Sequence, residues 1–236
     1  MTELPTRHIV ALGGGGFSEE PENPVLDDFI LGLTGKPRPR VCFVPTASGD
    51  SAGYVQRFYD AFPPGRAQTS HLPMFRPTAV DLRALVLAQD VVYVGGGSTV
   101  NLLAVWRAHG LDAVLREAWD RGVVLCGLSA GALCWFEGGS TDSHGSGLAP
   151  LRDGLGLLPG SFCPHYDSEQ ERRTTYQAFV LGGLPDGFAA DDGAGLHFVG
   201  TEAVEAVSSR LSARAYRVER DGWRVTETPL VTRLLS

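Results

Sequence analysis

Residues 123–133 read Val-Val-Leu-Cys-Gly-Leu-Ser-Ala-Gly-Ala-Leu, and the rest of the chain is interpreted around them. The apolar residues predict a buried strand, and the small residues after Ser129 predict the start of a helix. In this context Gly-x-Ser-x-Gly is typical of a nucleophile elbow, a sharp turn that lifts the serine hydroxyl clear of the backbone. Free N–H groups at a helix N-terminus favour developing negative charge. The N–H of Ala130 is therefore predicted to be one donor of an oxyanion hole.

Composition limits the classes of protein to which the chain can belong. The 236 residues, 43% of them hydrophobic, predict one domain spanning residues 1–236. A net charge of -7 and the lack of a basic cluster argue against a nucleic-acid partner. No apolar run approaches the roughly 18 residues of a membrane span, and the acidic N-terminus does not read as a signal peptide. Four cysteines without a C-x-x-C pair are expected to be reduced thiols in a cytoplasmic protein.

A second glycine motif follows another apolar strand. Residues 90–94 lead directly into Gly95-Gly96-Gly97 and then into a segment with helical spacing. A strand, a glycine turn and a helix N-terminus together form an anion cradle. Next to the elbow, the N–H of Gly97 would be the second oxyanion donor. Taken alone, the same loop would fit a nucleotide- or metabolite-binding module, which stays open as an alternative that is not an enzyme.

Two further glycine-rich stretches are interpreted as loops. Residues 13–16 follow the first strand, but they lack G-x-G-x-x-G, and the polar residues 18–24 after them predict no helix. A dinucleotide site is therefore disfavoured, and no cofactor is predicted. Residues 137–147 are polar and rich in glycine and serine, and they are expected to form a mobile loop.

The order of the predicted elements indicates the fold class. Strands and helices alternate up to the elbow, which predicts a mostly parallel sheet with helices on both faces. From about residue 195 the apolar residues alternate, and Asp221-Gly222 is a hairpin signal, so antiparallel strands are added near the C-terminus. The sequence therefore predicts an α/β protein with three α/β/α layers.

A serine nucleophile needs a general base, and two histidines are the main candidates. His165 follows Pro164 where a predicted strand stops. His197 would preserve the order serine, acid, histidine of α/β-hydrolase esterases, but its neighbours alternate as in a strand. His165 is favoured, and the esterase using His197 stays as an alternative.

The acid that orients the base is expected near Asp191-Asp192. Adjacent carboxylates repel, so one is predicted to point inward with a partner and the other outward. Spacing alone does not choose between them. No group of His, Cys and Glu has the spacing of metal ligands, and no metal is predicted.

Three motifs in this order resemble the peptidase E family of serine peptidases, S51, which includes cyanophycinases. They are the glycine loop and helix start at 94–103, the elbow at 127–132 and Pro-His-Tyr at 164–166. The resemblance implies a fold similar to the class I glutamine amidotransferase domain, which is flavodoxin-like. It implies Ser129 as nucleophile, His165 as base, and Gly97 and Ala130 as oxyanion donors. Asp192 would be the third member, where the family commonly has glutamate.

The resemblance also bears on substrate and assembly. The best-known members cleave dipeptides that begin with aspartate and use an arginine after the histidine. Arg172 and Arg173 are the candidates here, but the segment from 166 to 173 has an acidic start and a shorter loop. We therefore expect a peptidase for short peptides without assigning Asp-X specificity. Cleavage of cyanophycin or isopeptide bonds is an alternative, and relatives imply a possible homodimer.

Overall fold

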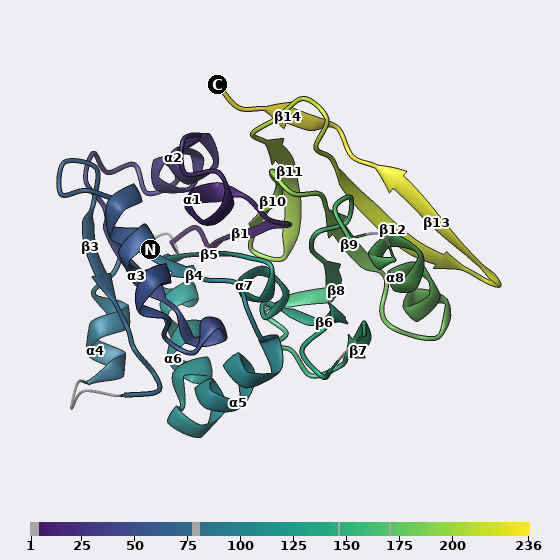
Figure 1. Ribbon diagram of the computed structural model, residues 1–236, viewed down its shortest axis with the longest axis horizontal. Helices are drawn as coiled ribbons and strands as arrows, with labels where there is room; N and C mark the ends of the chain where they lie inside the picture. Colours follow the sequence, from purple (N-terminus) through teal and green to yellow (C-terminus); the bar gives the residue numbers. More distant parts are fainter. Residues whose placement is uncertain (1–4, 77–80, 146, 170) are drawn as a thin grey trace.

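The computed structural model describes residues 5–76, 81–145, 147–169 and 171–236. Its central sheet has eight strands in the order β14-β11-β10-β1-β5-β4-β2-β3 (Figure 1). The five strands from β1 to β3 in this order are parallel, and β10 joins β1 antiparallel. The strands are β1 His8–Leu12, β2 Arg40–Val44, β3 Gln68–His71, β4 Val91–Val94, β5 Val124–Leu128, β10 Ala194–Val199, β11 Glu202–Ser208 and β14 Thr232–Leu234.

The central strands are buried on both faces because helices cover both. Val10 and Leu12 of β1 pack into a cluster with the first three helices, whereas Ile9 and Ala11 pack into a cluster with the next four. This alternation follows from the two-residue repeat of a strand. One layer holds α1 Gly16–Glu19, α2 Val25–Gly32 and α3 Ala52–Ala61. The other holds α4 Leu82–Leu87, α5 Thr99–His109, α6 Leu111–Asp120 and α7 Ala130–Leu133. A short 3-10 turn, η1, spans Thr46–Ser48.

A second sheet of six strands follows in the order β13-β12-β9-β8-β6-β7. Figure 1 shows it on the green and yellow side of the molecule, with α8 Arg172–Leu181 beside it. Tyr176 and Val180 of α8 pack against Val218 of this sheet. Its strands are β6 Phe136–Thr141, β7 Ala149–Leu151, β8 Leu158–Cys163, β9 Gly187–Ala190, β12 Ala215–Asp221 and β13 Arg224–Pro229.

The predicted fold class is confirmed: the protein is a mixed α/β fold whose parallel sheet carries additional antiparallel strands. Two local predictions are wrong. The segment expected as loop after the first glycine run contains part of the short helix α1, and residues 137–141 of the expected mobile loop belong to β6, Phe136–Thr141. A Cβ at Gly139 would overlap the Phe162 carbonyl, so this glycine permits close strand packing.

Two further points concern single elements. The sequence predicts a helix from Thr78 to Ala88, of which residues 78–80 lie outside the described residues; the remainder contains α4. Across the described part of the chain, no helix has both the length and the apolar character that crossing a membrane requires.

Candidate active site

The elbow has the backbone strain that its sequence predicts. β5 ends at Leu128, Ser129 follows with φ 52° and ψ -117°, and α7 begins at Ala130. A non-glycine residue at this φ is uncommon and marks a position that the surrounding structure enforces. Gly131 is required by close approach, because a Cβ there would overlap the carbonyl of Val94 on β4. Ser129 is partly exposed, so a bound molecule could reach its hydroxyl.

The end of β1 is the common support of the site. The Leu12 carbonyl accepts a hydrogen bond from the Ser129 amide at 3.2 Å, and the Gly13 carbonyl accepts one from the His165 amide at 3.2 Å. The next residue, Gly14, forms a parallel bridge with Asp192. Three consecutive residues therefore bring together segments that lie far apart in the sequence.

Gly14 also explains why the chain is glycine-rich here. A Cβ at Gly14 would overlap the Asp192 carboxylate and crowd the Glu19 carboxylate. The first glycine run thus provides space for side chains of the site.

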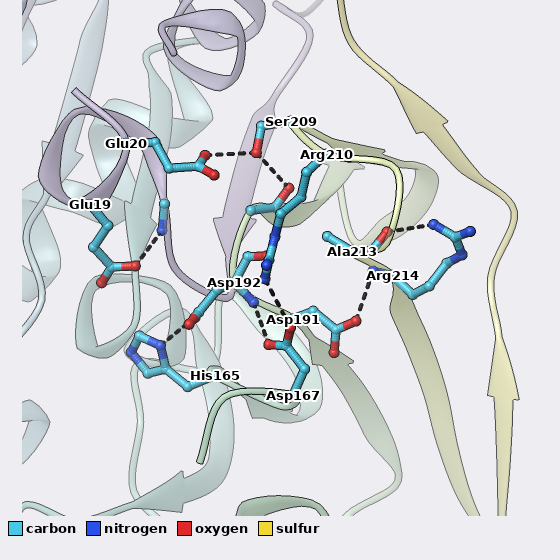
Figure 2. A network of polar contacts seen from close by, with 12 residues as sticks. Glu19, Glu20, His165, Asp167, Asp191, Asp192, Ser209, Arg210, Ala213 and Arg214 are labelled. Atoms are coloured by element: carbon cyan, nitrogen blue, oxygen red, sulfur yellow. Dashed lines mark hydrogen bonds and ion pairs between the residues drawn. The ribbon is translucent and has the colours of Figure 1, made fainter. Parts of the chain in front are cut away.

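His165 and Asp192 form a close pair. Their Nδ1 and Oδ1 atoms are 2.6 Å apart, and both side chains are mostly buried (Figure 2). His165 follows β8 with φ 52°, and Asp192 follows β9. With Nδ1 occupied by the carboxylate, Nε2 is the ring nitrogen left to accept a proton, which is the arrangement of a base and its orienting acid.

The pair shifts the pKa values of its members in opposite directions. Burial opposes the charged imidazole, but the hydrogen bond and the negative charge of Asp192 outweigh it, so the pKa of His165 is raised. Burial likewise disfavours the Asp192 carboxylate, but hydrogen bonds from His165 and Ser168 outweigh it and lower the pKa of Asp192. Both shifts stabilise an imidazolium facing a carboxylate, the state that general-base catalysis creates.

The two adjacent aspartates have separate environments. The Asp192 amide donates to Asp167 Oδ1 at 2.9 Å, and Arg210 Nε donates to the Asp192 carbonyl at 2.8 Å. Asp191 is buried on the other side, where its Oδ2 accepts the Arg214 amide at 2.9 Å. Burial raises the pKa of Asp191 to about 6. Figure 2 shows only Asp192 directed at His165.

The second glycine loop lies beside the elbow. A Cβ added to Gly96 would lie 3.4 Å from the Cβ of Ser129, so the two turns are in close contact. Gly97 has φ 135°, a backbone conformation that favours glycine. Ser98 caps α5 by accepting the Asn101 amide at 3.3 Å. Within the described ranges, the N–H groups of Gly97 and Ala130 have no acceptor in the protein. The geometry leaves them free for an oxyanion.

The two candidate arginines differ in their surroundings. Arg172 is buried, and its Nη2 lies 2.6 Å from Glu169 Oε2 and 3.9 Å from Asp142 Oδ2, beside a cavity of about 400 Å³. Arg173 forms an ion pair with Glu227 of β13 instead.

The sequence interpretation missed one residue, Glu19. Its Oε2 accepts the Gly15 amide at 2.7 Å. Single ligand atoms of Glu19, His165 and Asp192 all lie within 4.8 Å of one another, a spacing that could hold a cation. Burial raises the pKa of Glu19, although the Gly15 hydrogen bond opposes the shift. The only sequence signal was an acidic residue soon after a glycine run.

Other features lie away from the elbow. His197 is in β10, opposite Val10 of β1, and its Nε2 is 2.9 Å from His8 Nδ1. A cavity of about 750 Å³ lies beside β11 and contains none of the predicted catalytic residues.

Comparisons with known proteins agree with the fold and the motifs. The model of Peptidase family S51 matches residues 9–206. An uncharacterized peptidase, YgaJ of Bacillus subtilis (strain 168), is 52% identical over 231 residues, which is 98% of this chain and 100% of that protein. Peptidase E of Pasteurella multocida (strain Pm70) is 26% identical over 195 residues, 76% of this chain and 79% of its own.

Solved structures are similar in fold at low sequence identity. A peptidase from an acI-B1 actinobacterium has a TM-score of 0.70 at 18% identity, covering 96% of this chain and 95% of its own. A protein assigned as peptidase E from Listeria monocytogenes EGD-e has a TM-score of 0.64 at 20% identity, covering 88% of this chain and 100% of its own.

The fold and these relatives define a peptidase with a class I glutamine amidotransferase-like architecture. The family model covers most of the chain, from the first strand to β11. The chain belongs to peptidase family S51.

Proposed function

We propose that this peptidase is a serine peptidase that hydrolyses short peptides, with Ser129 as nucleophile, His165 as base and Asp192 as orienting acid. The observation that carries the proposal is the end of β1, where consecutive carbonyls bind the amides of Ser129 and His165 and the next residue pairs with Asp192. A rigid common support is what a catalytic group needs for precise placement.

The proposed reaction forms and hydrolyses an acyl-enzyme. Ser129 Oγ bonds to the peptide carbonyl carbon while His165 Nε2 takes the hydroxyl proton. The carbonyl electron pair moves onto oxygen, which accepts hydrogen bonds from Gly97 and Ala130. The oxyanion collapses, the C–N bond breaks, and His165 gives its proton to the leaving amine. Water then attacks the ester in the same way, releasing the carboxylic acid and restoring Ser129.

The proposed substrate class depends on the carboxylate that is already paired with Arg172. Glu169 already neutralises its guanidinium at 2.6 Å. A substrate aspartate would have to compete with this carboxylate, so we propose peptides without an obligatory N-terminal aspartate. Arg172 borders the cavity of about 400 Å³, whereas Arg173 forms an ion pair with Glu227.

We also propose a cytoplasmic location and a single catalytic domain. All four cysteines are buried free thiols, as is usual in a reducing compartment.

The test is hydrolysis of a dipeptide library, with Asp-X and other members side by side. We expect cleavage of several non-Asp members and its loss in Ser129→Ala. Ser51→Ala, on an exposed serine before α3, is the matched control. Cleavage confined to Asp-X peptides would contradict the proposed specificity. Absence of any Ser129-dependent cleavage would contradict the proposed substrate class. Labelling of Ser129 by a fluorophosphonate would then show whether Ser129 is still a reactive nucleophile.

A further inference from the structure

The Glu19 carboxylate faces the same space as the proposed catalytic pair. It extends from the short helix α1, and Figure 2 shows it on the His165 side of the glycine turn. The Gly15 amide fixes one carboxylate oxygen at 2.7 Å. Glu19 remains exposed, so a bound molecule can reach its second oxygen. Its neighbour Glu20 points away and accepts the Ser209 hydroxyl at 2.7 Å.

In the part of the chain that the structure describes, no Lys, Arg or His nitrogen lies within ion-pair distance, 4.0 Å, of the Glu19 carboxylate. Asp192 is paired with His165 at 2.6 Å, and Arg172 is paired with Glu169. Among the described residues, the hydrogen bond that Glu19 accepts comes from a neutral amide, that of Gly15. In a partly buried site such a carboxylate favours a positively charged ligand group.

A peptide substrate carries such a group at a fixed distance from the reacting carbon. The N-terminal ammonium nitrogen of the first residue is two bonds from that residue's carbonyl carbon, about 2.5 Å away. In the proposed reaction His165 Nε2 takes the proton of Ser129, so a peptide attacked at its first carbonyl would place its ammonium within a few bond lengths of the His165 ring. A Glu19 ligand atom lies within 4.8 Å of a ring nitrogen of His165.

We infer that Glu19 binds the N-terminal ammonium of the substrate and is a specificity-determining residue of the proposed site. This inference rests on the proposed function. It explains why the glycine run leaves space at Gly14, where a side chain would crowd the Glu19 and Asp192 carboxylates together. It also disfavours an acidic first residue, whose carboxylate would enter a site that already holds two.

The test compares Glu19→Gln with wild type on the best dipeptide of the library and on its N-acetyl derivative, with EDTA present throughout. Glutamine keeps an acceptor for the Gly15 amide but removes the charge. A hydrogen bond to a charged group contributes enough for a loss of about 10- to 100-fold in kcat/KM on the free dipeptide, mainly through KM. Fluorophosphonate labelling of Ser129, which needs no ammonium, should stay within twofold.

Glu20→Gln is the matched control, because it removes the adjacent charge and keeps an acceptor for Ser209. We expect it to retain wild-type kcat/KM. An unchanged kcat/KM in Glu19→Gln would overturn the inference. An equal loss of kcat/KM on the acetylated peptide, or an equal loss of fluorophosphonate labelling, would also overturn the inference. Either result would mean that Glu19 acts on His165 and Asp192 and not on the ammonium. If wild type neither cleaves any dipeptide nor labels at Ser129, the proposed function itself fails, which is a distinct outcome.

Discussion

Each end of β1 lies next to a histidine that is close to a carboxylate, but the pKa values of the two histidines are shifted in opposite directions. At the carboxyl end, His165 contacts Asp192 at 2.6 Å next to the strained Ser129. At the amino end, His197 stacks on His8, and its Nδ1 is 3.4 Å from Glu205 Oε1. The close carboxylate raises the pKa of His165 despite burial, whereas burial lowers the pKa of His197 because Glu205 compensates too little.

The difference shows that a histidine and an acid become a candidate catalytic pair only through their placement. Parallel strands gather their carboxyl ends at one edge of a sheet, where the turns after them can converge. β1 and β5 are parallel, so Leu12 and Ser129 meet at that edge. His197 is within antiparallel β10, where its ring is buried against other side chains.

The largest expected effect separates the two histidines by activity. His165→Ala should lower kcat by about 10⁴-fold or more, because the base is lost. His197→Ala should stay within about threefold of wild type. Both variants are compared by dipeptide hydrolysis after circular dichroism has shown that they are folded. An inactive but folded His197→Ala would instead favour the esterase-like arrangement.

A smaller effect is expected at the acid of the pair. Asp192→Asn should lower kcat by about 10³- to 10⁴-fold, because the imidazole loses its orienting charge. The acid limb of the remaining activity should move to lower pH, since Asp192 is what raises the pKa of His165. The measurement is the pH profile of kcat/KM.

Asp191→Asn is the control for that experiment, because Asp191 binds the Arg214 amide and not His165. It should retain activity within about threefold. Equal losses in the two variants would show that the Asp191-Asp192 turn acts as one structural unit.

The smallest effect concerns stability at the other end of β1. Burial lowers the pKa of both His8 and His197 in the folded protein. As pH falls below about 6.5, the unfolded chain therefore takes up protons that the folded state resists, and stability declines. Between pH 7.5 and 5.5, Tm should fall about 2–4 °C further in wild type than in His197→Phe. The measurement is a thermal-denaturation series over this pH range. The same pH dependence of Tm in wild type and His197→Phe would show that protonation of the His8–His197 pair does not destabilise the folded protein.

Part of this protein could be predicted because the signals are local. The family and the α/β class follow from short motifs and from strand–helix alternation, and both predictions are confirmed. The catalytic roles of Ser129, His165 and Asp192 stay predictions, although the structure brings the last two into contact. A strand-to-helix turn around Gly-x-Ser-x-Gly can be recognised from a few contiguous residues.

The missed features depend on partners distant in sequence. Residues 137–141 are polar and glycine-rich, which favours a loop locally, but pairing with β8 and β7 makes them part of a strand. Ser143 of the same segment accepts the Thr99 amide at 2.8 Å and helps cap α5. Glu19 acquires its position through the Gly15 amide, next to the point where Asp192, which follows β9, pairs with Gly14.

The sequence by itself predicted the strand-to-helix turn, the parallel sheet and the family, because short motifs and hydrophobic period are properties of contiguous residues. Only the tertiary structure decided which of Asp191 and Asp192 faces His165, and that Glu19 stands beside them. Those choices depend on which carboxylate is buried next to which amide or ring, and burial is a property of the packed molecule.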